Sequence, residues 1–198
     1  MNDEIWRCFV GVPIGEPLRA ELRTAVASLQ AGIASDPDEL RWTDPPAWHL
    51  TLAFLGATAA SDVRRLGEVL RQVAGEHAPF TIATGGLGAF PSRRDVRILW
   101  YGLADRSRRL AELAVAVRLA VGTETSSPFR AHLTLARARG DRGVAVPAGC
   151  WATPMPAGQV AVEELTLYRS HLGRGPARYE VLATAPLGLT LAGTRAAP

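Results

Sequence analysis

The sequence HLTLAFLG occupies residues 49–56, and its first four residues recur unchanged, as HLTL, at residues 132–135. With 4 histidines and 14 threonines in 198 residues, a given histidine has a threonine two positions later with a chance of roughly 0.07. The alternative is two ordinary buried strands that each happen to start with a histidine. Because the leucines also recur in both places, composition does not explain the repeat, which predicts two equivalent strands at one site.

The side chains of each copy fall into two sets by simple alternation. Successive residues of a strand point to opposite faces, so His49 and Thr51 share one face and the leucines between and after them take the other. The second copy repeats this split with His132 and Thr134. Such strands bury their leucines and present titratable and hydroxyl groups to a polar ligand.

Composition indicates a folded chain, with 47% hydrophobic residues and a net charge of +3. We expect residues 1–198 to form one domain made of two interleaved lobes, each carrying one copy of the motif.

All 22 basic residues are arginine, which is typical of a GC-rich genome and also suits phosphate oxygens. The two cysteines, Cys8 and Cys150, form neither a disulfide framework nor a zinc motif. Since no apolar run is long enough for a membrane span, we expect a soluble, cytoplasmic protein.

The rest of the chain reads as alternating helices and strands. Helical spacing of apolar residues follows Pro17, Ser61 and Asp105, and strands are expected at residues 4–12, 40–43, 80–83, 96–103, 160–168 and 177–183. The glycine-rich run at residues 85–91 lacks any phosphate-loop pattern and is interpreted as a strand end and turn. Each motif copy follows a helix and a loop, which predicts two similar lobes related by a pseudo-twofold axis.

Two histidines on opposite walls of a cleft suit displacement at phosphorus. One neutral imidazole can take a proton from the attacking oxygen while the other, protonated, gives a proton to the leaving oxygen. Thr51 and Thr134 would then bind the non-bridging phosphate oxygens. No carboxylate cluster accompanies the histidines, so we expect no metal ion and no other cofactor.

Further segments accompany the repeat, at residues 88–91 (GAFP), 97–100 (RILW) and 167–170 (LYRS), the last followed by Tyr179. With the paired motif, they resemble the 2H phosphoesterase superfamily, and within it the bacterial RNA 2′,3′-cyclic phosphodiesterases, also called 2′-5′ RNA ligase-like proteins. This resemblance covers nearly the whole chain.

The resemblance implies an α+β fold of two pseudo-symmetric lobes, with antiparallel sheets lining a central cleft and helices on the outside. It implies metal-independent hydrolysis of a 2′,3′-cyclic phosphate at an RNA end to a 2′-phosphomonoester, with weak reversible 2′-5′ RNA ligation beside it. In the family pattern His49 is the proton donor and His132 the proton acceptor, although the residues alone do not order these roles. The expected partner is RNA, with tRNA-derived fragments among the candidates, and the protein is expected to be a monomer.

Four more side chains are candidates for substrate binding. Arg137 matches a family arginine linked to the substrate phosphate, but alternation puts it opposite His132 unless a bulge intervenes. Arg130 is its rival. Phe54 is a candidate for stacking a base, with a core position as the alternative, and His171 is a candidate for contacting RNA, with a solvated loop as the alternative.

Two other functions stay open on the sequence. One is a relative that acts on a small cyclic or 2′-5′-linked nucleotide, since the motif reads the phosphate and the loops read the rest. The other is a module that binds RNA ends without turnover. The intact histidines and threonines argue against that module, because a binder has no need of two proton-transfer groups.

Overall fold

The computed structural model describes residues 3–33, 39–124, 128–171 and 177–188. The helices and strands along these residues are β1 (Ile5–Pro13), α1 (Leu18–Gly32), β2 (Leu40–Trp42), β3 (His49–Ala59), α2 (Val63–Gly75), β4 (Phe80–Ser92), β5 (Asp95–Ala104), α3 (Arg109–Ala120), β6 (His132–Ala138), β7 (Gln159–Val162), β8 (Glu164–His171) and β9 (Arg178–Pro186). The α+β class expected from the sequence is confirmed.

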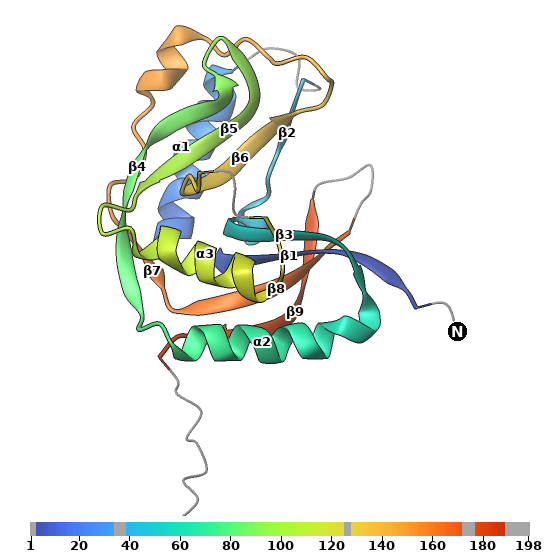
Figure 1. Ribbon diagram of the computed structural model, residues 1–198. Helices are drawn as coiled ribbons and strands as arrows, with labels where there is room; N and C mark the ends of the chain where they lie inside the picture. The colour runs from blue at the N-terminus through green and yellow to red at the C-terminus, as the bar shows by residue number, and fades with distance from the viewer. Residues whose placement is uncertain (1–2, 34–38, 125–127, 172–176, 189–198) are drawn as a thin grey trace, which may run out of the picture.

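All the strands belong to one curled antiparallel sheet in the order β7-β4-β5-β6-β3-β1-β8-β9, with β2 added at β6 (Figure 1). The order is symmetric about the junction of β6 and β3, so each motif strand begins one half of the sheet. Within the described residues the two halves pair there only at Leu50 and Leu133. Beyond this point β3 and β6 diverge, and the expected two sheets are therefore two halves of one.

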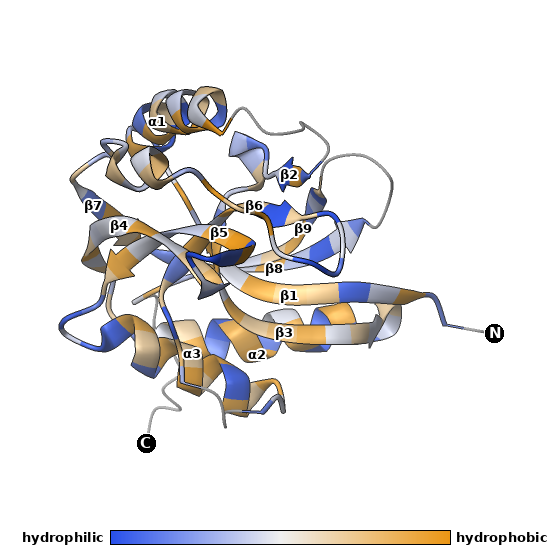
Figure 2. Cartoon of the chain, turned by 90° about the horizontal axis from the view of Figure 1, so that it is seen from above, coloured by the Kyte–Doolittle hydropathy of each residue, from blue (hydrophilic) through white to orange (hydrophobic). Residues whose placement is uncertain are grey.

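The helices cover the outer sides of the two halves. α2 packs on β8 and β9, and α3 packs on β3 and on α2. α1 lies on the other side of the molecule, beside β4, β5 and β6 (Figures 1 and 2). Gly67 of α2 brings this helix close to the sheet, since a Cβ atom there would lie 3.3 Å from the Cβ of Ala183 in β9.

The predicted turn at residues 85–91 is wrong, because β4 continues through the glycine run as far as Ser92. The neighbouring strand β5 places the ring of Trp100 against this run, and a Cβ atom on Gly88 would lie only 2.2 Å from it. A register shift against β5 falls inside the run, between Thr84 and Leu87. Gly88 thus makes room for a large aromatic ring within a strand that does not reverse there.

Candidate active site

The two motif copies lie on neighbouring antiparallel strands. Leu50 lies opposite Leu133, and each side chain is 1% exposed. Residues directly opposite each other on neighbouring strands point to the same face of a sheet. Because the strands are antiparallel, extending the register by one residue from the leucine pair puts His49 opposite Thr134 and Thr51 opposite His132. These four side chains therefore occupy the face opposite the leucines and are related by a pseudo-twofold axis through the leucine pair.

Each histidine ring is held by the carbonyl two residues before it. The Nδ1–H of His49 donates to the oxygen of Ala47, and the Nδ1–H of His132 donates to the oxygen of Arg130, both at 2.8 Å. Because a carbonyl oxygen only accepts, Nδ1 carries the proton of each neutral ring and Nε2 is the reactive nitrogen. Nε2 of His49 lies 3.0 Å from Oγ1 of Thr51. Both rings are thus prepared to exchange protons through Nε2.

Both histidines are neutral in the free protein near pH 7. Burial lowers the pKa of His49 to about 4, with further lowering by the charges of Arg137 and His132 against an opposing hydrogen bond to Ala47. Burial and the charge of Arg137 also lower the pKa of His132. The charge of the arginine thus acts on both rings. A bound phosphate anion would oppose these effects and favour the protonated form of a histidine.

A β-bulge in each motif strand turns the following side chain onto the histidine face. In β6, Thr134 pairs with Trp100 while Ala136 pairs with Leu99, the residue before it. Between these two pairs β6 therefore has one more residue than β5. The bulge that Arg137 needed in order to face the histidines is therefore present. β3 repeats it, since Thr51 pairs with Gly11 while Ala53 pairs with Val10.

The repeat is thereby longer than four residues. Ala53 and Ala136 are identical, both buried, and both lie just beyond the bulge. The next residues, Phe54 and Arg137, occupy equivalent positions in the two halves. The first difference between the copies thus falls on the histidine face, where one half presents an aromatic ring and the other a cation.

A cavity of about 370 Å³ lies on the His49 side of the motif pair. Its lining includes three of the predicted binding residues, Phe54, Arg137 and His171, together with His49 and Thr51. His132, Thr134 and Arg130 do not line it. This cavity therefore adjoins His49 and not His132.

The remaining candidates divide between the cavity and its surroundings. Phe54 is 62% exposed, which contradicts the core alternative, and its ring centroid lies 6.3 Å from that of Phe9. His171 is paired through Nε2 with Glu180 at 2.9 Å. Arg130 lies on the other side of the site, with its guanidinium carbon 6.0 Å from the centroid of the Phe90 ring. Arg137 is thus the candidate arginine that reaches the cavity.

Aromatic rings surround both histidines. Phe9 and Tyr179 lie 4.6 and 5.0 Å from His49 between ring centroids, and Phe90 lies 5.1 Å from His132. Sequence reasoning did not place Phe90 beside His132, because the two come together only through the pairing of β4 with β5 and of β5 with β6. These rings supply the burial that lowers the histidine pKa values.

Sequence reasoning also missed two cavity-lining arginines, Arg7 in β1 and Arg41 in β2. Alternation along β1 puts Arg7 on the same face as Phe9, a signal that was available in the sequence. The pairing of Arg41 with Arg137 depends on the register of β2 against β6 and left no local signal.

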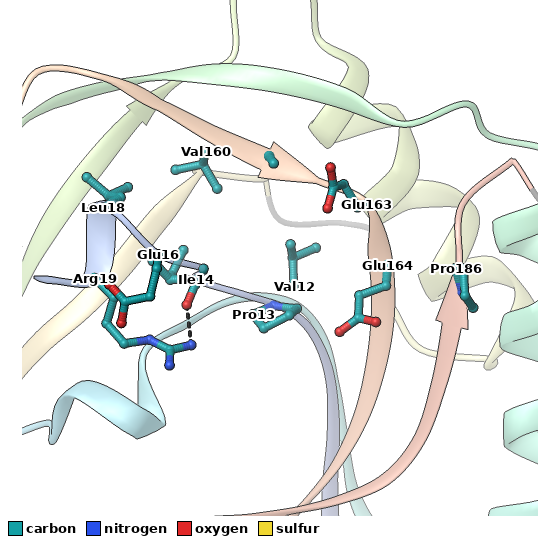
Figure 3. Close-up of a pocket in the computed structure, with 12 residues that line it drawn as sticks. Val12, Pro13, Ile14, Glu16, Leu18, Arg19, Val160, Glu163, Glu164 and Pro186 are labelled. Atoms are coloured by element: carbon teal, nitrogen blue, oxygen red, sulfur yellow. Dashed lines mark hydrogen bonds between the residues drawn. The ribbon is translucent and has the colours of Figure 1, made fainter.

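A second cavity, of about 600 Å³, opens between the start of α1 and the ends of the strands around β8 (Figure 3). Its lining includes the carboxylates of Glu16, Glu163 and Glu164 and the guanidinium of Arg19. Arg19 is turned to the backbone oxygen of Ile14. Because carboxylates outnumber cations here, this cavity repels phosphate, whereas the cavity beside His49 attracts it.

Among the residues that the structure describes, no group of three or more histidine, cysteine or carboxylate side chains is placed to hold a metal ion. No helix among these residues is long and apolar enough to cross a membrane.

Comparison with known proteins agrees with this geometry. Residues 17–100 match the model of the LigT like Phosphoesterase family. A Bacillus subtilis protein named RNA 2′,3′-cyclic phosphodiesterase is 31% identical over 87% of this chain and 91% of its own length. A Geobacillus stearothermophilus protein of the same name is 30% identical over 88% of this chain, which spans only 56% of that relative's length. The structure of Escherichia coli LigT complexed with 3′-AMP matches with a TM-score of 0.71 and 27% identity, covering 93% of this chain and 99% of the other. With two HxTx motifs paired at the centre of a curled antiparallel sheet, this chain belongs to the LigT-like family of 2H phosphoesterases.

Proposed function

We propose that this protein hydrolyses the 2′,3′-cyclic phosphate at an RNA end to a 2′-phosphomonoester, without a metal ion. The observation that carries this function is the antiparallel pairing of the two motif strands, which presents two Nε2 atoms and two threonine hydroxyls on one face. The names of the relatives supply the RNA substrate class. Two imidazoles beside arginine, with no carboxylate lining the described cavity, are a poor set of ligands for a divalent cation.

The reaction needs one proton acceptor and one proton donor on opposite sides of phosphorus. His132 takes a proton from water as its oxygen attacks phosphorus, and the bond from phosphorus to O3′ breaks. His49, which must be in the protonated form that a bound phosphate favours, gives its Nε2 proton to O3′, so one proton is taken up and one released. Thr51, Thr134 and Arg137 hold the phosphate oxygens, where charge builds up in the transition state.

The position of the cavity supports this order of roles. In an in-line displacement the nucleophile and the leaving group lie on opposite sides of phosphorus. A water molecule needs little space, whereas the leaving O3′ carries the ribose and the rest of the RNA. The 370 Å³ cavity adjoins His49 and offers space for the nucleoside on that side, which supports His49 as the donor and His132 as the acceptor.

Weak 2′-5′ ligation is the same displacement with the 5′-hydroxyl of a second RNA end in place of water. It would use the same residues in the same roles, with His132 taking the proton of the 5′-hydroxyl and His49 giving a proton to O3′. That the RNA is a tRNA-derived fragment, that the protein is monomeric and that residues 1–198 are a single domain stay predictions.

The test is turnover of an oligoribonucleotide ending in a 2′,3′-cyclic phosphate by protein treated with EDTA. We expect a 2′-phosphate product, and we expect His49→Gln and His132→Gln each to lower kcat by about 10²–10⁴-fold. His77→Gln, which removes a histidine outside the site, is the matched control. A 3′-phosphate product would reverse the choice of leaving oxygen, and near-normal activity in either active-site variant would exclude the two-histidine mechanism.

A further inference from the structure

The cavity beside His49 holds more positive charge than the reacting phosphate requires. Arg7 from β1, Arg41 from β2 and Arg137 from β6 all line it, and its described lining contains no aspartate or glutamate. None of the three forms an ion pair with any residue that the structure describes. Arg169 on neighbouring β8 differs, since it pairs with Glu4 at 2.8 Å. The cavity therefore keeps three guanidinium groups available for an anion.

The arrangement of these arginines is unfavourable without a ligand. Arg41 and Arg137 are direct partners across β2 and β6, and like charges placed opposite each other destabilise a sheet. The charge of Arg7 adds to burial in lowering the pKa of Arg137, although Tyr179 opposes it. Such a cluster is expected where an anion completes it.

Neutralising the charge of the reacting phosphate requires only one of the three arginines. A cyclic phosphodiester carries one negative charge, and Arg137 is the arginine whose field reaches both histidines. Arg7 and Arg41 lie in the same cavity on the His49 side, where the leaving nucleoside fits. In an RNA chain, the next anionic group beyond that nucleoside is the phosphodiester on its 5′ side.

We propose that Arg7 and Arg41 bind the phosphodiester that precedes the terminal nucleotide, so that the protein distinguishes an RNA chain end from a free nucleoside 2′,3′-cyclic phosphate. This inference rests on the proposed function and adds a second anion subsite to it. The cavity volume of about 370 Å³ lies within the range of sites that enclose small ligands, so it suits one nucleoside with its neighbouring phosphate. The exposed ring of Phe54 lies in the same lining and offers a face for the base.

The experiment compares three substrates that share the same reacting end. They are adenosine 2′,3′-cyclic phosphate, the dinucleotide ApA ending in a 2′,3′-cyclic phosphate, and the same dinucleotide with a neutral methylphosphonate linkage. We expect kcat/KM of the unmodified protein to be roughly 10- to 100-fold higher for the charged dinucleotide than for either other substrate, as for the loss of one or two hydrogen bonds to a charged group. Arg7→Gln and Arg41→Gln should each lower this ratio several-fold, and Arg23→Gln, an exposed change on α1, should leave it unchanged.

The outcomes separate this inference from the proposed function. If none of the three substrates is hydrolysed, the proposed function fails. If all three are hydrolysed with equal kcat/KM, or if the preference for the charged linkage survives in both arginine variants, the second subsite is wrong while the hydrolase stands. A preference shared by the charged and neutral dinucleotides would assign the recognition to the second nucleoside and contradict a role for its phosphate.

Discussion

The low pKa of His49 predicts that this residue makes the fold less stable in mild acid. Its pKa is about 4 in the folded protein against 6.5 ordinarily, so the unfolded chain binds a proton more readily than the folded one. Stability from this group is fully present above pH 6.5 and is lost as the pH falls toward 4. With these two values, the loss between pH 7.5 and pH 5.0 is about 2 kcal/mol.

The assay is urea unfolding of the unmodified protein and of His49→Gln at both pH values. Other groups also titrate over this interval, but they contribute to both proteins, so the comparison uses the difference between the two pH-dependent losses. The unmodified protein should lose about 2 kcal/mol more than the variant, and His77→Gln controls for the removal of a histidine as such. Equal losses in the unmodified protein and His49→Gln would show that His49 is not desolvated, and the argument from burial would then be refuted.

Three further predictions follow from individual contacts. Because burial and Arg137 lower both histidine pKa values below 6.5, the pH optimum of kcat/KM should lie below 6.5. Arg137→Gln should move this optimum upward while lowering activity, and an unchanged optimum would exclude the arginine's influence on the pair. Gly11→Ala puts a Cβ atom 2.8 Å from a backbone oxygen of β3 and 3.3 Å from Cδ2 of His49, so it should cost about 1–3 kcal/mol of stability and lower kcat/KM. Gly149→Ala, with no atom within 4 Å of the added group, is the control, and equal effects of the two changes would contradict the close approach. Leu133→Ala should destabilise the protein by about 2–5 kcal/mol in urea unfolding, and a loss below 1 kcal/mol would show that the junction of the two halves is not a packed core.

Much of the site's local organisation follows from the sequence. Alternation within each tetrapeptide separates His49 and Thr51 from the buried leucines, and the observed burial of both motif strands shows this separation. The same alternation puts Arg137 on the wrong face of the strand, because it assumes a strand without a bulge. The glycine run at residues 85–91 misleads for a related reason: closely spaced glycines suggest a turn, but here Gly88 clears space for Trp100, which comes from another strand.

The sequence by itself determined which residues lie on each face of two equivalent strands, and its resemblance to a family implied the α+β class. The faces depend on spacing within a few residues, and such spacing is fixed by the geometry of a single strand. Only the tertiary structure decided that a cavity adjoins His49, and that Arg7, Arg41 and Arg137 line it. Those residues come from β1, β2 and β6, and they are brought together by hydrogen-bond register between strands and by a bulge that shifts it. Register is a contact between distant segments, so no local pattern specifies it.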